Sequence, residues 1–527
     1  MKGYWIPVLH SHLPFIKHPE HDYFLEEHWL FEAISETYIP LLMKFRQLES
    51  EGVEFFMTTS ITPPLAEMLD DRHLMEKYLA HLDRMLELCN KEVARCEHDP
   101  HFSGITKFYL DRFSKIREFF IGFLNYNVLN GYRYFASKGN LEIITCGATH
   151  GYLPLLSVNP KAVEAQISIA VDTHKKHFGV SPNGIWLPEC AYYEGLDEYL
   201  SKYGIKFFFM DSHGLVYARP TPKYGVFAPM YTPKGVLAFG RDPESSKQVW
   251  SSKEGYPGDL DYRDFYRDVG FDLDYEYIRP YICPDGTRVF VGLKYHRVTG
   301  EGEFKEVYNP IHADAKAISH AQNFHYNRVK QIEHLSQFME DRPPAVVSPY
   351  DAELFGHWWF EGPDFLYYLF KEFDSKKELK AITPMQYLAL HPSNQVCAPN
   401  PSSWGDKGYY DVWLNRSNEW IYRHLHHICD ELCSLANRYK DSSDYLINRV
   451  LNQLSRELLL AQSSDWAFLM TTKTAVEYST KRTKEHISNF IKLSDMLKRN
   501  EINEQLLSKL EEKNSIFPNI DFRVYAD

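Results

Sequence analysis

The sequence lacks the segments that hold a chain in a membrane or mark it for export. It has no run of about 18 apolar residues, the length that a transmembrane helix needs. Its first residues, MKGYWIPVLHSHLP, have neither the apolar core nor the cleavage site of a signal peptide. The 8 cysteines are scattered without a CxxC pair, which favours reduced thiols over a disulfide scaffold. We therefore expect a cytoplasmic protein without a membrane partner.

Positive charge is also scarce. The chain has 58 Lys and Arg residues against 71 Asp and Glu residues, a net charge of −13 at pH 7. Such a field repels polyanions, and no basic run with interleaved aromatic residues is present, so we expect no nucleic-acid partner. The sequence has no glycine-rich phosphate loop before a helix and no GxSxG elbow. It therefore gives no support for nucleotide binding or serine-hydrolase chemistry.

Aromatic residues, by contrast, are abundant. The 36 Tyr, 34 Phe and 10 Trp residues make up 15% of the chain. Aromatic rings fill protein cores, and they also stack on the apolar faces of sugars, so composition alone permits both interpretations. The chain of 527 residues exceeds the roughly 250–300 residues at which a single core stops growing, and we therefore expect two or three packed units.

Short apolar runs alternate with helical patterns through the first two-thirds of the chain. The predicted strands are Tyr4–Leu9, Val53–Met57, Glu142–Cys146, Gly184–Leu187, Phe207–Met210, Val289–Leu293 and Ala345–Pro349. Long helical patterns, such as Leu30–Leu48 and Ala313–Met339, lie between several of them. This alternation predicts a mostly parallel sheet that is either open or closed into a barrel.

Two stretches interrupt the alternation. Residues 66–136 have only helical patterns, which indicates an insertion between the second and third strands. After about residue 385 the strands stop, and a recurrence of Leu446, Val450, Leu454 and Leu458 every four residues is typical of a helical core stripe. The predicted units are two parts of one sheet-bearing domain at 1–65 and 137–385, the helical insertion 66–136, and a helical C-terminal domain at 386–527.

Polar residues follow the predicted strands at their C-terminal ends. The clusters are His10 with His12, then His150, then Glu189, then Asp211 with His213, and finally Asp351 with Glu353 and His357. In parallel α/β barrels the loops that follow the strands converge at this end, and catalytic residues gather there. We therefore expect these side chains to share one rim.

Two kinds of chemistry fit this rim equally well. In a glycosidase, two carboxylates flank the scissile bond, and nearby histidines hydrogen-bond sugar hydroxyls. In a metal-dependent hydrolase of the amidohydrolase type, His10, His12, His150, His213 and Asp351 would bind a divalent ion. A third interpretation also stays open here, in which the histidines are satisfied core residues and the aspartate caps a helix.

The complete motifs resemble the five regions that define glycoside hydrolase family 57, in particular its 1,4-α-glucan branching enzymes and related amylase-type members. The matching segments are His10–Pro14, Gly139–His150, Trp186–Glu189, Ser348–Trp359 and Ser463–Trp466. The resemblance extends over nearly the whole chain, and its third and fourth segments are specific to the family.

This resemblance implies an α/β fold, namely an incomplete (β/α)7 barrel with a helical insertion and a C-terminal all-helical domain that completes the active site. It implies a retaining mechanism with Glu189 as nucleophile and Asp351 as general acid/base, and neither a catalytic metal nor a cofactor. The residues that it assigns to substrate binding are His10, His12, His150, Arg241, Trp404, Trp413 and Asp465. Trp29 matches too, but core packing stays an alternative for it.

A retaining mechanism sets requirements for the two carboxyls. They should face each other about 5–6 Å apart. Glu189 should be ionised, with hydrogen-bond donors and partial solvation around it. Asp351 should hold a proton in the resting enzyme, with a pKa raised by its carboxylate neighbour and by desolvation.

The reaction outcome depends on what attacks the glucosyl intermediate, because a glucan 6-hydroxyl makes a branch and water gives hydrolysis. Two departures from branching members weaken the shielding from water. The segment Tyr217–Gly235 is short, with Tyr231 as a stand-in for a covering Tyr, and His296 replaces a Trp. The C-terminal segment and the loop of Trp404 and Trp413 match the branching subgroup best. We therefore predict a 1,4-α-glucan branching enzyme for amylose, glycogen or starch, with an α-amylase-like hydrolase or a 4-α-glucanotransferase as the alternative.

Two further interpretations of the sequence have less support. A non-catalytic carbohydrate-binding protein would keep an aromatic cleft but would not need the paired acids Glu189 and Asp351. Cys429 and Cys433, beside His424 on a predicted helix, have the spacing of a zinc half-site. No partner cluster of matching spacing is present, so a structural role is favoured for them.

Overall fold

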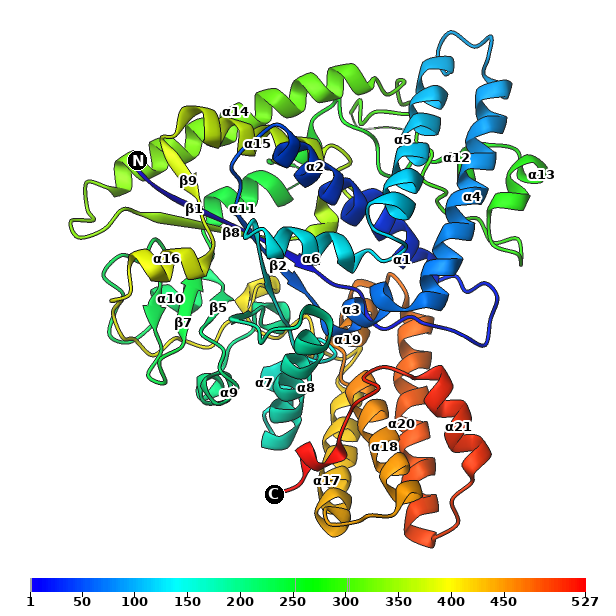
Figure 1. Ribbon diagram of the computed structural model, residues 1–527, viewed down its shortest axis with the longest axis vertical. Coiled ribbons are helices and arrows are strands. Elements are labelled where there is room, and N and C mark those ends of the chain that lie inside the picture. The colour runs from blue at the N-terminus through cyan, green and yellow to red at the C-terminus, as the bar shows by residue number, and fades with distance from the viewer. Residues whose placement is uncertain (1, 252, 301, 303) are drawn as a thin grey trace.

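The computed structural model describes residues 2–251, 253–300, 302 and 304–527. Parallel strands flanked by helices form its larger part, and a bundle of helices forms the C-terminal part, drawn in orange and red (Figure 1). The parallel strands are β1 Gly3–Ser11, β2 Met57–Ile61, β3 Leu141–Ile144, β4 Gly184–Ile185, β5 Phe207–Met210, β7 Leu237–Gly240 and β8 Ala345–Asp351.

These strands form an open barrel. Strands β8, β1, β2 and β3 are hydrogen-bonded in that order, and β4, β5 and β7 form a second run. A bridge between Thr145 and Ile185 joins the two runs. On the other side, β7 and β8 are linked by a hydrogen bond from Asp242 N to Val347 O of 2.9 Å instead of a ladder. The seven strands β1, β2, β3, β4, β5, β7 and β8 thus make an incomplete barrel, which confirms the predicted fold class.

Two short strands lie outside this series. Strand β6, Met230–Tyr231, pairs antiparallel with β7. Strand β9, Leu379–Ala381, pairs parallel with the beginning of β1.

Alternation along the strands carries polar side chains to the end of the barrel interior. In β1, the side chains of Tyr4, Ile6 and Val8 pack with the inward residues of the other strands, whereas Trp5 packs toward the helices. Because side chains alternate between the two faces, His10 continues the inward series. The same step of two residues leads from Val347 to Pro349 and Asp351, from Phe209 to Asp211, and from Phe239 to Arg241.

Two predicted strands differ from the structure. Val289–Leu293 forms no strand, because the N–H groups of Val291 and Gly292 donate to the buried carboxylate of Asp268 at 3.0 and 2.9 Å. The carboxylate of Asp268 thus accepts the backbone hydrogen bonds that the carbonyls of a neighbouring strand would otherwise accept. The second strand begins at Met57 rather than at Val53, since its ladder with β3 begins there.

The barrel is interrupted and covered by helices. Between β2 and β3 lie α3 Pro63–Asp70, α4 Arg72–Arg95, α5 Ser103–Gly122 and α6 Leu129–Ser137. The other helices of this part are α1 Glu27–Ala33, α2 Ile39–Ser50, α7 Leu153–Leu156, α8 Pro160–Phe178, α9 Leu196–Lys202, α10 Ser212–Val216, α11 Pro243–Trp250, α12 Val269–Asp272, α13 Tyr275–Ile278, α14 Pro310–Leu335, α15 Gly362–Lys376 and α16 Pro384–Leu390.

A π-helical turn, Ile34–Tyr38, joins α1 to α2. Pro40 lies at the start of α2 and has no N–H to donate to the carbonyl of Glu36 four residues earlier, which explains the local widening of the helix. The chain at Gly356 passes directly against this carbonyl. The π-helical turn therefore fixes the path of the loop that follows β8.

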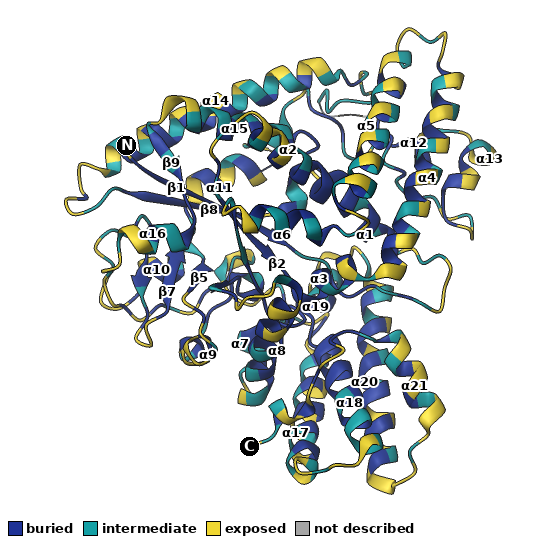
Figure 2. Ribbon diagram, viewed as in Figure 1, coloured by how far each residue is buried: buried dark blue, intermediate teal, exposed yellow. Residues whose placement is uncertain are grey.

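The C-terminal helices form a bundle that contacts the barrel at one end. They are α17 Trp420–Tyr439, α18 Tyr445–Ala461, α19 Ser464–Thr472, α20 Val476–Arg499 and α21 Glu504–Lys513. Val450, Leu454 and Leu458 of α18 are buried in the bundle core, and Figure 2 shows the inner faces of α18 and α20 in dark blue. At the start of α19, Ser464 N donates to His150 O at 3.1 Å, which joins the bundle to the loop after β3. No helix among the described residues is long and apolar enough to cross a membrane.

We expect Gly356→Ala to destabilise the protein strongly. Gly356 has a φ of +117°, and a Cβ atom there would lie 1.8 Å from the Glu36 carbonyl oxygen. The backbone strain and the overlap together should cost at least about 3 kcal/mol and lower the thermal midpoint. Gly139→Ala is the matched control, because Gly139 has a φ of +79° with nothing within 4 Å of a new Cβ. Equal melting temperatures for the two variants would contradict the close approach at Gly356.

Candidate active site

A pocket of about 390 Å³ opens at the C-terminal ends of the barrel strands. It is lined by His10, His12, Leu13, Trp29, Glu32, Ala33, His150, Glu189, Asp351, Glu353, His357, Trp358, Trp404, Asp465 and Phe468. Strands β1 and β8 place His10 beside Asp351 in register, and Asp465 comes from α19. The pocket therefore brings the two predicted catalytic carboxylates together with His10, His12 and His150, the three histidines that were expected to bind substrate.

Glu189 lies in a strained turn after β4. Its backbone has a φ of 60°, and that of Cys190 has a φ of 55°. Non-glycine residues rarely adopt this left-handed conformation, and it persists where surrounding contacts hold it. Two donors hold the carboxylate, since Ser464 Oγ donates to Oε1 at 2.8 Å and Trp404 Nε1 donates to Oε2 at 3.0 Å. Both donors come from the chain beyond the barrel strands.

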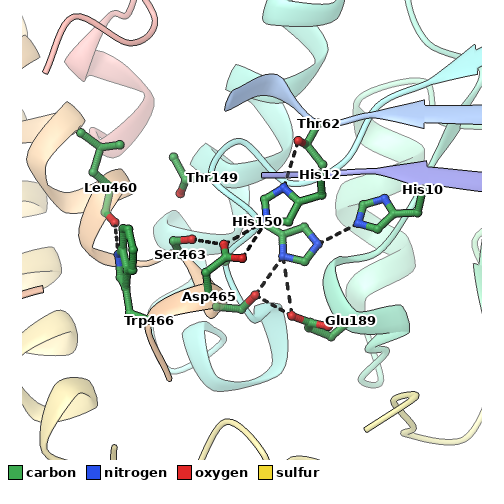
Figure 3. A network of polar contacts seen from close by, with 12 residues as sticks. His10, His12, Thr62, Thr149, His150, Glu189, Leu460, Ser463, Asp465 and Trp466 are labelled. Carbon is green, nitrogen blue, oxygen red and sulfur yellow. Dashed lines mark hydrogen bonds and ion pairs between the residues drawn. The ribbon is translucent and has the colours of Figure 1, made fainter. Parts of the chain in front are cut away.

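A chain of hydrogen bonds leads through two histidines to Glu189 (Figure 3). Burial lowers the pKa of both His10 and His150 well below the ordinary value, so both rings are neutral. Ser464 donates its one hydroxyl proton to Glu189 and therefore accepts from His150 Nδ1 at 2.8 Å. His150 Nε2 then accepts from His10 Nε2 at 3.1 Å, and His10 Nδ1 accepts from Ser60 Oγ at 3.2 Å. Every proton of the chain points toward Glu189, which favours negative charge there.

His12 forms an ion pair with Asp465 of α19. Its Nε2 lies 2.9 Å from Oδ2 and 3.1 Å from Oδ1, and its Nδ1 lies 3.0 Å from Thr62 Oγ1. Burial lowers the pKa of His12, but the charge and the hydrogen bond of Asp465 outweigh it, so the pKa of His12 is raised. Burial raises the pKa of Asp465, and His12 outweighs it in turn, so the pKa of Asp465 is lowered. This pair joins the helical bundle to the end of β1.

The histidines also form two candidate metal clusters, with ligand atoms within 4.8 Å of one another: His10–Cys146–His150 and His12–His150–Asp465. The ring geometry favours hydrogen bonding instead. The rings of His12 and His150 stack with centroids 3.8 Å apart and planes at 15°, so their in-plane lone pairs do not converge on one ion. Burial raises the pKa of the Cys146 thiol well above its ordinary value, which opposes the thiolate that zinc requires. A metal-free site stays our prediction.

Asp351 ends β8 and is exposed to the open pocket. Burial in the walls of the pocket raises the pKa of Asp351 to about 6, against the lowering effect of Arg241 and then of His12, and water in the open pocket moderates this shift. Burial also raises the pKa of Glu189 to about 7, against its two hydrogen bonds. The raised pKa of Asp351 matches the expectation. The pKa of Glu189 is nevertheless higher than that of Asp351, whereas Glu189 was expected to be the ionised group and Asp351 the protonated one. Burial, and not the neighbouring carboxylate, is the main cause, and the two groups titrate over the same pH range.

Arg241 lies behind the pocket wall and is not part of its lining. Its Nη1 lies 3.4 Å from Asp211 Oδ2, and its guanidinium lies 5.8 Å from the centroid of the Trp404 ring. His213 Nδ1 contacts the same Asp211 carboxylate at 3.1 Å. Arg241 therefore supports the Trp404 ring and supplies positive charge near Asp351. Direct contact with substrate was expected for Arg241, but its position outside the pocket lining does not favour such a contact.

The predicted tryptophans divide into two groups. Trp29 and Trp404 line the pocket, whereas Trp413 is 1% exposed and stacks on Tyr152 with ring centroids 4.5 Å apart. Trp413 thus packs behind the loop of Trp404, and its expected place in the cleft lining is corrected. Tyr231 also lies outside the lining, with its hydroxyl donating to Pro392 O at 3.1 Å.

Comparison with known families decides which enzyme class has this geometry. Residues 6–399 match the model of glycosyl hydrolase family 57, and residues 424–525 match that of the C-terminal domain of 1,4-alpha-glucan branching enzymes. The chain belongs to glycosyl hydrolase family 57. The predicted family is confirmed, and with it the prediction that the protein is a glycoside hydrolase or transglycosylase.

Similar family-57 proteins include both branching enzymes and an amylase. The chain is 34% identical to a 1,4-alpha-glucan branching enzyme of Thermococcus kodakarensis, over 98% of this chain and 78% of that protein. Its structure resembles that of the alpha-amylase AmyC from Thermotoga maritima, with a TM-score of 0.94, 47% identity, and coverage of 100% and 99%. It also resembles the branching enzyme from Pyrococcus horikoshii, with a TM-score of 0.90, 33% identity, and coverage of 100% and 97%.

Sequence reasoning assigned no role to several pocket residues of this family-57 enzyme. Glu353 accepts from His12 N at 3.2 Å and from the Tyr38 hydroxyl at 2.5 Å, and burial raises its pKa to about 7. In the sequence, the position of Glu353 within the fourth matched segment, Ser348–Trp359, was the feature that pointed to a place in the site. Glu32 lies on α1, and helical periodicity does not tell which polar face borders a pocket. Ser464 lies in the fifth matched segment, but its bond to Glu189 depends on a distant part of the fold.

We expect Ser464→Ala to shift the acid limb of the pH profile to higher pH. The Ser464 hydroxyl stabilises ionised Glu189, so its removal raises the pKa of Glu189. Because glycosylation needs ionised Glu189, activity falls as the pH drops through the apparent pKa of the carboxyl pair. A hydrogen bond to a charged group contributes about 1.5–3 kcal/mol, so the acid limb of kcat, which reports the substrate complex in which Asp351 holds the shared proton, should rise by about one pH unit or more.

Ser464→Thr is the matched control, because it keeps the hydroxyl and should leave the limb near its original pH. The other charged groups and histidines that act on Glu189, namely His12, His150, Asp351 and Asp465, are unchanged in both variants. An unshifted limb in Ser464→Ala, with activity lower at every pH, would reduce Ser464 to a packing role.

Proposed function

We propose that this protein is a 1,4-α-glucan branching enzyme that acts on amylose, glycogen or starch-type chains. One observation carries the proposal. Ser464 and Asp465 of the helical bundle bond directly to Glu189 and His12 of the pocket, and the bundle is the part that matches branching enzymes. We further propose a cytoplasmic location, since the 8 cysteines are free thiols and 7 of them are buried.

In the first step, Glu189 attacks the anomeric carbon of a glucose unit inside an α-1,4-linked chain. Asp351 donates its proton to the glycosidic oxygen, the carbon–oxygen bond breaks, and the chain end beyond it leaves as an alcohol. The product is a glucosyl ester on Glu189 with the opposite anomeric configuration. This step requires an ionised Glu189 and a protonated Asp351, which is one proton for the pair.

In the second step, Asp351 is a carboxylate and acts as the base. It removes the proton from a glucan 6-hydroxyl, the oxygen attacks the anomeric carbon, and Glu189 leaves as a carboxylate. Two inversions restore the α configuration, and an α-1,6 branch results. Asp351 regains its proton, so no proton is gained or lost over the cycle.

Substrate binding and the hydrogen bonds around Glu189 together favour the productive form of the pair. Two forms carry a single proton, with the proton on either carboxyl, and the pKa values of about 7 for Glu189 and about 6 for Asp351 lie close together. A sugar bound against Asp351 removes water from that exposed carboxyl and raises its pKa further. Glu189 keeps its donors Ser464 and Trp404 in the same complex. Substrate binding therefore moves the proton toward Asp351, where the mechanism needs it.

Hydrolysis is the second candidate, and the open side of the pocket favours it. Among the described lining residues, none comes from the segment Tyr217–Gly235, and Tyr217 is 58% exposed. Water therefore has access to the glucosyl ester when no acceptor chain is bound. The similarity to an alpha-amylase supports the same outcome.

We expect incubation with amylose to produce α-1,6 linkages. Proton NMR of the product should show new α-1,6 anomeric signals, and debranching should release chains shorter than the substrate. Glu189→Gln keeps the side-chain shape but removes the attacking charge, so it should lower branch formation by about a thousandfold or more. Reducing ends that increase without any α-1,6 signal would instead identify a hydrolase.

A further inference from the structure

The pocket has a second wall, formed in part by the loop that follows Asp351, that the catalytic steps above do not use. This wall consists of Glu32 from α1 and of His357 and Trp358 from the loop after β8. Trp358 is 55% exposed although it lines the pocket, so one face of a large ring is available to a ligand. An exposed indole beside a carboxyl and an imidazole is the combination that binds the apolar face and the hydroxyls of a sugar.

Trp358 is held rigidly from behind. Its ring stacks on Phe265 with centroids 4.4 Å apart and planes at 20°. Lys294 is 1% exposed, and its Nζ lies 4.2 Å from the ring centroids of both Phe265 and Phe290. The same Nζ donates to the carbonyl of Phe265 at 2.5 Å. A buried cation therefore fixes the ring on which Trp358 stacks, and the indole needs little ordering when a sugar binds.

His357 is fixed in a similar way. Its Nδ1 lies 2.7 Å from Glu36 Oε2, and the other oxygen of Glu36 accepts from Arg263 Nη1 at 2.9 Å. Burial raises the pKa of Glu36, but Arg263 and His357 outweigh it, so the pKa of Glu36 is lowered and the group is ionised. Nδ1 of His357 thus donates inward, which leaves the Nε2 edge of the ring for the pocket.

Glu32 completes the wall with a carboxyl that is 15% exposed and lies 3.7 Å from His28 Nε2. The charges that act on it are those of His357, Glu36, Lys294 and Asp268. Of these groups only His357 lines the pocket, and its charge links Glu32 to this wall. Its carboxyl is able to bond the hydroxyl groups of a sugar in either protonation state.

His357 and Trp358 follow Asp351 on one loop, and Trp358 N donates to Glu353 O at 3.2 Å, so this wall is on the Asp351 side of the pocket. Glu189 must touch the anomeric carbon, so Trp404 and Ser464 beside it border the sugar that becomes the ester. Asp351 must touch the oxygen on the other side of the bond. We infer that Glu32, His357 and Trp358 form the acceptor subsite, which binds the departing chain in the first step and the incoming glucan in the second. This inference rests on the proposed function, because only a transferase needs to hold an acceptor.

The test is the partition of the glucosyl ester between an acceptor and water. α-Maltosyl fluoride is the donor, because fluoride leaves without occupying a sugar subsite, and added maltohexaose is the acceptor. The ratio of transfer product to free maltose does not depend on how fast the ester forms. In Trp358→Ala this ratio should fall about fivefold or more at subsaturating acceptor, because the stacking platform is lost. Glu32→Gln should lower it in the same direction.

Two further variants keep the test specific. Trp250→Ala is the matched control, because Trp250 is 54% exposed at the end of α11, outside the pocket lining, and the ratio should not change. Trp358→Phe keeps a ring and should retain most of the ratio, even if the alanine variant folds poorly.

The outcomes separate this inference from the proposed function. An unchanged ratio in Trp358→Ala, with a raised KM for the donor, would assign the wall to the donor side and overturn the inference, whatever linkage the enzyme makes. An unchanged ratio and an unchanged KM would overturn it as well. A lowered ratio in an enzyme that makes no α-1,6 bonds would support the acceptor subsite and refute branching.

Discussion

Ionisation of Glu189 is favoured by two hydrogen bonds whose donors lie outside the barrel strands. Burial alone raises the pKa of this carboxyl, and Ser464 Oγ and Trp404 Nε1 oppose that effect, one at each oxygen. The neutral imidazoles of His10 and His150 orient the Ser464 hydroxyl, so Glu189, the proposed nucleophile, is linked to β1, to the loop after β3 and to α19 together. In the proposed mechanism, Glu189 therefore depends on its contact with the helical bundle to hold its charge.

The ion pair of His12 and Asp465 is a second contact that holds the helical bundle against the barrel. It joins the end of β1 to α19 within the pocket, and neither member has an equivalent partner in its own domain among the described contacts. The strained backbone at Glu189 and His150, with φ values of 60° and 58°, lies at the same junction. The contacts across this junction compensate for the strain, which explains why the active site forms between the two units and not within the barrel alone.

The positions of the main site residues were predictable because a strand has a period of two. Inward apolar residues such as Ile6 and Val347 lead by even steps to His10 and Asp351, so alternation and strand ends suffice to place those side chains on one rim. The role of Trp413 was not predictable, because a tryptophan in a loop has the same local pattern whether it faces a cleft or Tyr152. The absence of a strand at Val289–Leu293 depends on the distant Asp268, and the pKa order of the carboxyls depends on burial that only the folded chain defines.

In the proposed mechanism Glu189 carries the sugar during catalysis, and chemical trapping tests this role most directly. Asp351→Asn removes the acid/base, but a donor with a good leaving group, such as α-maltosyl fluoride, still forms the ester because its departure needs no proton. Mass spectrometry of the digested Asp351→Asn variant should find maltosyl on the peptide that contains Glu189. A label on another carboxylate of the pocket, such as Glu353 or Glu32, would contradict the account.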